Sequence, residues 1–459
     1  MIDTRAAEQN RPHVVVVGAG FGGLSAARRL GRAPVDVTLI DKRNHHLFQP
    51  LLYQVATAGL SPADIAAPVR SILKGQGNTR ILLDRVVGID KDQRCVQLER
   101  GASIAYDWLI LATGARHSYF GKDAWAPFAP GVKTIDDATA VRRKILMALE
   151  RAETETDKAR RDALLTFVVI GGGPTGVEMA GAIAELTHHA TSNEFRNITP
   201  HCSRILLVQS APRLLPAFPA DLSERARRAV EAMGVEVILG RRVESVCAEG
   251  VSIGDLWVPA ATAIWAAGIQ ASPAAQWLGV DADGAGRVPV NIDMTVPGIA
   301  RTFVVGDTAA CPDGAGGLLP GIAPVAKQQG YHVADNICRG LSGRAARPFR
   351  YRNYGNIATI GRKRAVADFG RFHLSGFPAW FLWCTAHVWF LTGFRNRLIV
   401  GMNWLWHYFT FNRGARLITG DIERMPADVA PAINAMPSQS PVSEPATTTA
   451  LPKSPTPRY

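Results

Sequence analysis

Two glycine-rich segments, each directly after an apolar run, decide the fold. The first reads Val14-Val-Val-Val-Gly18-Ala-Gly20-Phe-Gly22-Gly23, and the second reads Phe167-Val-Val-Ile-Gly171-Gly-Gly173-Pro-Thr-Gly176. A buried strand, a Gly-x-Gly-x-x-Gly turn and a helix hold a dinucleotide pyrophosphate, because the glycines admit the phosphates and the helix N-terminus supplies N–H donors. One such unit is a weak signal. Two in one chain predict two dinucleotides and electron transfer between them.

The second strand of each unit ends where a ribose is contacted. The strand expected from Val35 to Ile40 ends in Asp41, whose carboxylate can accept hydrogen bonds from ribose hydroxyls. In the second unit, the strand expected from Ile205 to Val208 is followed by Gln209, a neutral side chain. The two units therefore share one design but differ in charge at the ribose.

A later strand with a glycine turn recurs in both units. Thr113-Gly114 ends such a strand in the first unit, and Ile264-Trp-Ala-Ala267-Gly268 mirrors it in the second. Gly306-Asp307 repeats the design, and its acid can bind a flavin ribityl hydroxyl. This internal repeat predicts an α/β fold with two Rossmann-like dinucleotide-binding domains, the second inserted in the first. We expect the first domain at 10–120 and 299–345, and the second at 121–298.

Composition limits the partners. A chain of 459 residues with 47% hydrophobic content can form more than one packed domain. The net charge of +12 calls for an anionic partner, which is nucleic acid, anionic lipid or a phosphate-bearing cofactor. Basic and aromatic residues interleave only late in the chain, so we expect no nucleic-acid binding. The six cysteines show no C-x-x-C spacing, so no disulfide framework and no metal site is expected.

The composition changes near residue 350. Aromatic side chains crowd between 377 and 411, and Asp368 is the sole acid between 361 and 420. The longest apolar run, 377–394, is shorter than the roughly 20 residues that span a bilayer, and tryptophan with arginine favours the lipid headgroup boundary. We expect 346–420 to be an amphipathic membrane-association region; a dimer interface or an aromatic core cap is the alternative. Residues 421–459, rich in Pro, Ser and Thr, predict a disordered tail.

The stretch after Asp41 is the most specific in the chain. It reads Asn44-His-His-Leu-Phe-Gln-Pro50-Leu-Leu-Tyr-Gln-Val-Ala-Thr-Ala-Gly59-Leu-Ser-Pro62 and closely resembles the same region of type II NADH:quinone oxidoreductases, single-subunit flavoenzymes of respiratory membranes. Further segments resemble that family: Val169–Glu178, Trp265–Ile269, Val305–Thr308, Ala323–Gly330, Gly376–Trp383 and Gly414–Ile418. The resemblance covers roughly residues 12–420. It implies a glutathione-reductase-like fold and a respiratory enzyme that pumps no protons.

The resemblance also implies cofactors and sites. FAD is expected on the first fingerprint and NADH on the second; hydride passes to flavin N5, and the reduced flavin gives two electrons to a membrane quinone. Residues implied in cofactor binding are Gly18, Gly20, Phe21, Gly22, Gly23, Asp41, Lys42, Val86, Thr113, Gly114, Gly171, Gly173, Gly176, Gln209, Ala267, Gly268, Gly306 and Asp307. Those implied in quinone binding are Ala323, Lys327 and Gln328. Glu178 is implied as a catalytic residue that supplies protons; the alternative is a first-turn helix acid stabilised by the helix dipole.

Two positions depart from the family pattern. Pro324 stands where many relatives have glutamine, and because proline lacks a backbone donor and a side-chain amide, quinone placement would rest more on Gln328. Gln209 stands where an acid would bind the NADH ribose and repel the 2′-phosphate of NADPH. Neutral Gln209 repels that phosphate less, and Arg213 could attract it. We therefore expect NADH as the donor, with NADPH also possible.

The expected partners are NADH, a membrane quinone and an anionic membrane surface, and the chain is expected to form a homodimer. Residues 1–12 carry no signal-peptide pattern, so we expect a peripheral protein on the cytoplasmic side of a bacterial inner membrane. Three other classes stay open from the residues. A sulfide:quinone oxidoreductase or a disulfide reductase needs adjacent cysteines, and a non-enzymatic redox sensor would bind the same cofactors without rapid turnover.

Overall fold

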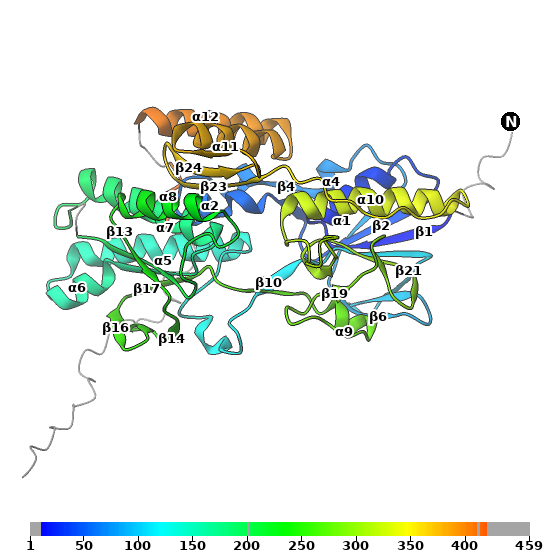
Figure 1. Cartoon of the computed structure of the whole chain (residues 1–459), viewed down its shortest axis with the longest axis horizontal. Helices are drawn as coiled ribbons and strands as arrows, with labels where there is room; N and C mark the ends of the chain where they lie inside the picture. The colour runs from blue at the N-terminus through cyan, green and yellow to red at the C-terminus, as the bar shows by residue number, and fades with distance from the viewer. Residues whose placement is uncertain (1–10, 200–201, 411–413, 420–459) are drawn as a thin grey trace, which may run out of the picture.

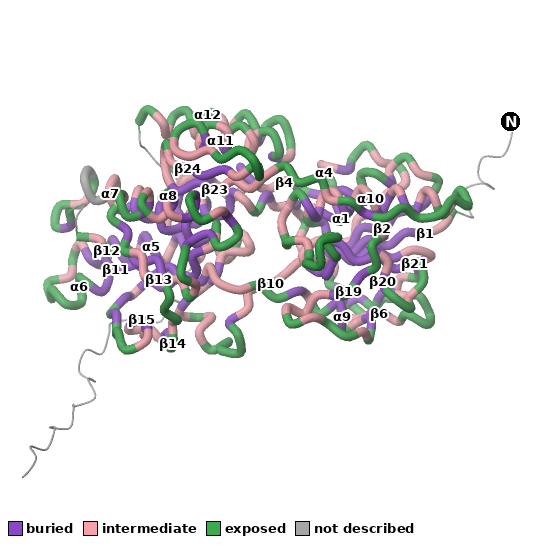
Figure 2. The backbone as a smooth tube through the Cα atoms, viewed as in Figure 1, coloured by how far each residue is buried: buried purple, intermediate pink, exposed green. Residues whose placement is uncertain are grey.

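The structure, a computed structural model, describes residues 11–199, 202–410 and 414–419. Two lobes lie side by side, each built on a sheet whose central strands are parallel (Figure 1). In both lobes the central strands are buried and the outer segments are exposed (Figure 2). The α/β fold with two Rossmann-like units is therefore confirmed. The predicted tail, 421–459, lies outside the described residues.

The first lobe is organised by a six-stranded sheet. Its strand order is β20-β21-β9-β1-β2-β5, with the bounds Thr295–Val296, Ile299–Val304, Trp108–Leu111, His13–Val17, Asp36–Asp41 and Thr79–Leu83. β1 pairs in parallel with β2 on one side and with β9 on the other. A central strand of such a sheet is covered on both faces, which explains why Val14 to Val17 are all apolar and buried.

Two helices of the first lobe pack unusually closely. α1 (Phe21–Leu30) follows the first glycine turn, and α10 (Ala323–Leu341) lies against it. A Cβ on Gly330 would lie 2.1 Å from the carbonyl oxygen of Gly22, so only glycine permits this approach. The contact places the segment Ala323–Gly330 next to the first fingerprint.

Shorter elements complete the first lobe. They are β3 (His45–Leu47), α2 (Leu52–Ala56), α3 (Pro62–Ile65), β4 (Ala66–Pro68), α4 (Val69–Ile72), β6 (Val86–Asp90), β7 (Cys95–Leu98), β8 (Ser103–Ala105), β19 (Val288–Pro289) and β22 (Ala309–Ala310), with 3-10 turns at Gln49–Leu51 and Gly306–Thr308. α2 packs against the second lobe, because Leu52 and Val55 belong to the core of that lobe. The stretch that is most specific in sequence therefore joins the two lobes.

The second lobe has a four-stranded parallel sheet, ordered β13-β12-β11-β17. The strands span Val235–Leu239, Arg204–Gln209, Thr166–Ile170 and Thr262–Trp265. One face is covered by α5 (Ile135–Thr154), α6 (Lys158–Leu164), α7 (Pro174–Asn193) and α8 (Ala220–Glu231), and the other by the antiparallel strands β14 (Val243–Val246), β15 (Gly250–Ile253) and β16 (Leu256–Pro259). Phe167 and Val169 pack into one core while Val168 and Ile170 pack into the other, so β11 is apolar on both faces.

The chain crosses between the lobes twice. β10 (Ala115–His117) leaves the first lobe and pairs antiparallel with β18 (Ile269–Ala271), which returns to it. After β18, α9 (Ala274–Leu278) and residues such as Val288 and Met294 are buried in the first core. The return therefore lies near residue 271 rather than at 299 as the sequence suggested. The connecting elements are two to five residues long and show no periodicity that could place them.

The C-terminal region contains both a core cap and exposed helices. β23 (Asn356–Gly361), β24 (Arg364–Asp368) and β25 (His373–Ser375) form a sheet that packs on α7 and α8. A Cβ on Gly181 of α7 would lie 1.7 Å from Ile360 O, so this contact is close. α11 (Phe377–Phe390) and α12 (Phe394–Thr410) lie above the sheet (Figure 1). Within the described part of the chain, no helix is long and apolar enough to cross a membrane.

Candidate active site

Both glycine fingerprints adopt the same backbone geometry. The first glycine has a positive φ, +100° at Gly18 and +113° at Gly171, which side chains with a Cβ rarely adopt. A Cβ on the last glycine, Gly23 or Gly176, would lie 1.8 or 1.7 Å from the carbonyl oxygen of the first. These four glycines are therefore required by the packing of strand, turn and helix.

The middle glycine of each fingerprint has a different role. A Cβ added at Gly20 or at Gly173 would meet no protein atom within 4 Å. Packing does not require glycine there, and the space lies at the N-terminus of α1 or α7, where backbone donors hold a pyrophosphate. The residues present therefore fit two bound dinucleotides.

Asp41 and Gln209 occupy matching positions at the ends of β2 and β12. Asp41 accepts hydrogen bonds from the backbone N–H of Ala19 at 2.6 Å and of Arg43 at 2.7 Å. Gln209 Oε1 accepts one from Gly172 N at 3.0 Å. Each side chain thus ties the strand end to its glycine turn, and an acid stands at the first site but not at the second.

Two further predicted residues lie beside Asp41. The backbone N–H of Asp84 donates to Asp41 O at 3.0 Å, which brings the following strand β6 and its buried first residue, Val86, close to the ribose position. Burial, reinforced by the neighbouring cations Arg43 and Arg85, lowers the pKa of Lys42. The first site therefore combines one acid, one amine and an apolar contact.

The later glycine turns of the first lobe meet in space. Thr113 Oγ1 lies 2.5 Å from Ser272 Oγ and 3.2 Å from Thr308 Oγ1, and Thr308 donates to Gly114 O at 3.1 Å. Ser272 comes directly after β18 and was not predicted from the sequence. The result is a cluster of three hydroxyls at one end of the sheet.

Gly306 and Asp307 are held by two residues that the sequence did not single out. Buried Gln329 accepts a hydrogen bond from Gly306 N at 2.7 Å. Lys133 Nζ lies 3.8 Å from Asp307 Oδ2. Lys133 precedes α5 of the second lobe, so this ion pair connects the lobes beside the predicted flavin position.

In the second lobe, Gly268 has a positive φ of +72°, and its neighbour Ala267 lines a cleft that also contains Gln209.

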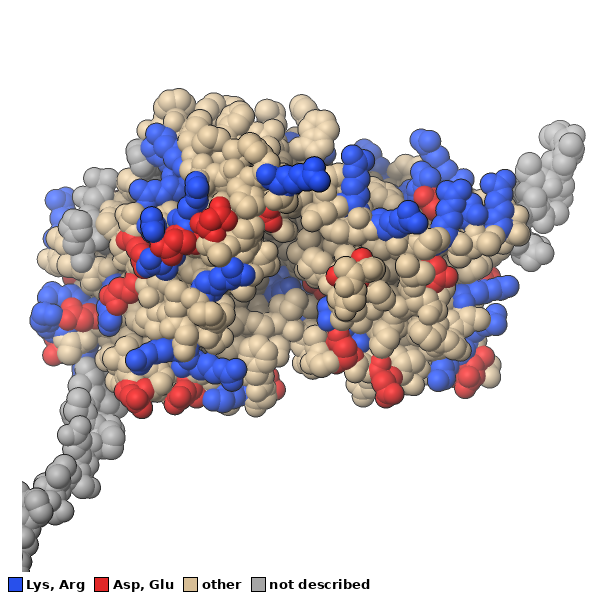
Figure 3. All heavy atoms as spheres, viewed as in Figure 1, with Lys and Arg blue, Asp and Glu red and all other residues tan. Residues whose placement is uncertain are grey.

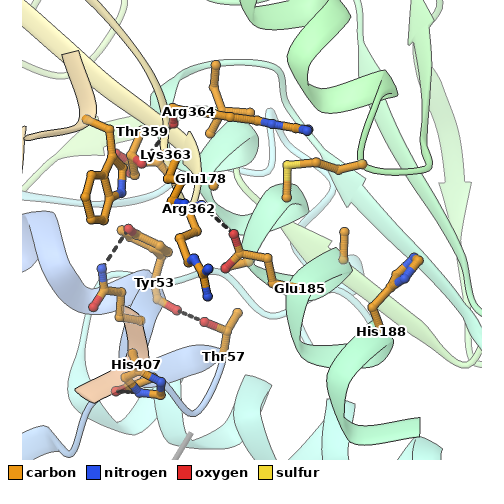
Figure 4. Close-up of a pocket in the computed structure, with 18 of the residues that line it drawn as sticks. Tyr53, Thr57, Glu178, Glu185, His188, Thr359, Arg362, Lys363, Arg364 and His407 are labelled. Atoms are coloured by element: carbon orange, nitrogen blue, oxygen red, sulfur yellow. Dashed lines mark hydrogen bonds between the residues drawn. The ribbon is translucent and has the colours of Figure 1, made fainter. Parts of the chain in front are cut away.

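A cavity of about 780 Å³ is lined by residues of α2, α7, the turn between β23 and β24, and helices α11 and α12. Glu178, Glu185 and His188 reach it from α7, while Tyr53, Thr57 and His407 line the opposite wall (Figure 4). Burial raises the pKa of Glu178 to about 8, although a backbone hydrogen bond from Thr359 lowers it in part. At neutral pH the Glu178 carboxyl therefore keeps its proton.

The alternative for Glu178, an acid in the first helical turn, is wrong. α7 begins at Pro174 and has no acid in its first turn. The helix dipole acts mainly within that turn, and it would favour the charged form. The Glu178 carboxyl lines the cavity, where burial removes it from water. Loss of hydration disfavours the charged form, so the neutral form is favoured instead.

Tyr53 and its partners form the wall next to Glu178. Gln54 Nε2 donates to Tyr53 Oη at 2.9 Å, and Trp404 Nε1 donates to Gln54 Oε1 at 2.8 Å. Burial raises the pKa of Tyr53, with the nearby Glu178 adding to the effect. Tyr53 and Gln54 lie within the stretch quoted above as most specific, which was the only signal that could have found them.

The predicted quinone segment lies outside this cavity. None of Ala323, Lys327 and Gln328 is among the residues that line it. Lys327 Nζ lies 5.3 Å from the ring centroid of Phe390 on α11, and burial lowers its pKa. Gln328 binds the backbone of Arg352 through both ends of its amide, at 3.0 and 2.9 Å. Both regions contact α11, the cavity through Trp383 and Cys384 and the α10 segment through Phe390.

Comparison with known proteins decides the family. Residues 12–330 match the pyridine nucleotide-disulphide oxidoreductase family model, and residues 354–413 match that of the NDH2 C-terminal domain. The chain is 43% identical over 424 residues to the type II NADH:quinone oxidoreductase Ndh of Mycobacterium tuberculosis, covering 89% of this chain and 90% of the relative. It is 44% identical over 429 residues to NdhA of the same organism, covering 90% of each. The chain belongs to the type II NADH:quinone oxidoreductase family.

Solved structures agree with the type II fold. NDH2 from Plasmodium falciparum, in complex with NADH, superimposes with a TM-score of 0.82 at 19% identity, covering 90% of this chain and 100% of the other. The sulfide:quinone oxidoreductase from Aquifex aeolicus gives 0.69 at 21% identity, covering 84% and 92%. At these identities only the fold is shared. The identity of 43–44% to the two mycobacterial type II enzymes favours that family over the sulfide:quinone and disulfide-reductase alternatives.

Proposed function

We propose that this chain oxidises NADH and reduces a membrane quinone through FAD, without pumping protons. The observation that carries the proposal is the pair of fingerprints with one shared geometry, in a chain of the type II family. Bound FAD supplies the two-electron carrier that accepts hydride from NADH and passes two electrons to the quinone. The protein itself contributes binding, orientation and electrostatics.

We assign FAD to the first lobe and NADH to the second. Asp41 would hold the FAD ribose, and Gly20 leaves room for its pyrophosphate. The hydroxyl cluster at Thr113 and the Asp307–Lys133 pair lie where the lobes meet. The domain at 10–120 and 299–345, extended by the packing of residues from 271 onward, is therefore proposed to bind FAD. The rest of 121–298 is proposed to bind NADH.

We propose that Glu178 supplies a proton during quinone reduction. A quinone that gains two electrons must also gain two protons. A carboxyl with a pKa of about 8 holds a proton at neutral pH and can release it, which is the property required of a general acid. We place the quinone head between Glu178 and the α10 segment, with Lys327 near its entrance.

We also propose that α11 and α12 rest on an anionic membrane. Large apolar side chains on these helices are exposed, among them Phe381, Trp389, Phe394, Trp406 and Phe409. Figure 3 shows a surface with few charges over the helices and lysine and arginine side chains along its border. Aromatic residues with a basic border suit the headgroup layer. Since NADH is a cytoplasmic metabolite, the protein would lie on the cytoplasmic side of a bacterial inner membrane.

A homodimer on the same membrane face is a further part of this proposal. The exposed apolar residues extend along both helices. A second copy could cover part of this area while both copies keep contact with lipid. Analytical ultracentrifugation in detergent tests this part, and a monomer at all concentrations would contradict it.

The direct test of the proposed function is a turnover assay on purified protein. NADH loss is followed with and without a short-chain quinone, and the flavin content of the same sample is recorded. NADH loss that depends on quinone and scales with flavin content supports the proposal. Flavin that NADH reduces but quinone does not reoxidise would favour the redox-sensor alternative.

A further inference from the structure

A second cleft, of about 400 Å³, opens beside Gln209 at the proposed NADH site. Its lining contains three cationic side chains, Lys122, Arg241 and Arg242, and no acidic one. Gln209 itself is neutral, and its Oε1 faces the backbone N–H of Gly172. The cleft at the ribose position is therefore positively charged.

The fold brings the two arginines to this position. Gln209, the last residue of β12, pairs with Leu239, the last residue of β13. The loop that follows β13 then turns onto the loop that follows β12, because Gly240 N donates to Ala211 O at 3.1 Å. Arg241 and Arg242 come directly after this contact and so lie beside the ribose position.

Both arginines are available to an anionic ligand. Their residues are exposed, and within the described ranges neither guanidinium has a hydrogen bond or an ion pair. Lys122 differs, because its Nζ donates to Glu244 O at 2.7 Å and lies over the Trp125 ring. The cleft thus holds two guanidinium groups ready to bind a ligand and one amine already engaged.

Arg213, which the sequence suggested as a phosphate contact, is placed elsewhere. Its guanidinium donates to Pro216 O at 2.9 Å within its own loop. Arg213 is not among the residues that line the cleft. The sequence had no means of finding Arg241 and Arg242, which follow Gln209 by more than 30 positions.

We propose that Arg241 and Arg242 bind the 2′-phosphate of NADPH, so that this site accepts NADPH as well as NADH. The inference rests on the proposed function, because it concerns the nucleotide of the same site. Guanidinium groups match the oxygens of a phosphate dianion and bind it through paired, charge-assisted hydrogen bonds. An acid at position 209 would repel that dianion, whereas Gln209 does not.

The test measures binding apart from catalysis. ADP-ribose and 2′-phospho-ADP-ribose are titrated by calorimetry into the FAD-loaded protein and into the double variant Arg241→Ala/Arg242→Ala. We expect the variant to bind the phosphorylated ligand about tenfold more weakly and ADP-ribose within about threefold of the parent protein. Gln209→Glu should also weaken only the phosphorylated ligand. Raising the salt concentration should weaken that ligand selectively.

Arg213→Ala is the matched control, since it removes an arginine from the same side of the lobe. We expect it to leave the affinity for both ligands unchanged. Equal losses for both ligands in the double variant, or a selective loss in Arg213→Ala instead, would overturn the assignment of Arg241 and Arg242. If the parent protein binds ADP-ribose but not 2′-phospho-ADP-ribose, the proposed binding of NADPH is overturned, while the proposed oxidation of NADH is not. Failure to bind either ligand would contradict the proposed function itself.

Discussion

Glu178→Gln should separate a catalytic from a structural role for this half-buried acid. Glutamine keeps the size and the acceptor oxygen of glutamate but cannot carry charge or donate an acidic proton. In the parent protein the pKa of Glu178 is raised from 4.5 to about 8 by burial. The variant therefore changes both stability and proton transfer, and each change has its own pH dependence.

The effect on stability has a definite sign. Between pH 4.5 and pH 8 the unfolded chain has lost the Glu178 proton while the folded protein keeps it, so the parent protein loses stability as the pH rises through this range. A pKa rise from 4.5 to about 8 corresponds to ~5 kcal/mol. Because the cavity admits solvent, we expect about half of this. Glu178→Gln should therefore equal the parent in stability below pH 4.5 and exceed it by about 2.5 kcal/mol above pH 8.

The effect on catalysis is measured in separate half-reactions. Reduction of the flavin by NADH should keep its rate in Glu178→Gln, because hydride transfer needs no protein proton donor. Quinone-dependent turnover should fall by about 100-fold. In the parent this turnover should decline above pH 8, as Glu178 loses its proton, and the variant should not show that decline.

Glu185→Gln is the matched control, because Glu185 lies on the same helix and lines the same cavity. Its carboxylate accepts from Arg362 N at 2.5 Å, and glutamine retains an acceptor there. We expect this variant to keep the pH profile of the parent. If Glu178→Gln retains full quinone turnover and the parental decline above pH 8, the proton-supply role is refuted. If the stability of Glu178→Gln relative to the parent does not increase as the pH rises, the raised pKa of Glu178 is refuted as well.

Three further outcomes are expected. Asp41→Ala should lower the FAD content of the purified protein, measured as the ratio of flavin to protein absorbance; full flavin content would contradict the ribose contact assigned from its position beside Ala19. Gly173→Ala should weaken NADH binding by about tenfold without shifting the melting temperature, because its Cβ meets no protein atom; an equal loss of stability would show that packing requires this glycine. Trp389→Glu/Phe394→Glu should release the protein from anionic vesicles while leaving NADH oxidation with a soluble dye intact, since the two residues are 71% and 81% exposed; unchanged sedimentation with vesicles would exclude these helices as the membrane contact.

Local features of the chain were predicted well from sequence. β1 and β11 are short runs of buried residues, and their glycine turns depend on neighbours only a few positions away. The position of Asp41 could be predicted because the length of its strand determines where the last residue of that strand lies relative to the glycines. The same reasoning placed Gln209 correctly at the matching position of the second lobe.

Contacts between distant segments were not predictable in the same way. The Lys133–Asp307 pair joins residues of different lobes. No sequence motif contains both residues, so the sequence could not predict that they pair. The sequence offered a core cap only as an alternative in 346–420, because a buried sheet such as β23 to β25 and a membrane-facing helix are both rich in apolar residues. The burial of Ala358, Ile360 and Val366 in the core of the second lobe, together with the close contact of Gly181 with Ile360, shows that this sheet belongs to the core.

The central claim is that one bound flavin carries electrons from NADH to quinone. The most direct test is an anaerobic titration of the FAD-loaded protein, followed by flavin absorbance. One equivalent of NADH should bleach the flavin, and one equivalent of a short-chain quinone should restore it completely. Flavin that stays reduced after the quinone is added, or that NADH does not reduce, would contradict the account.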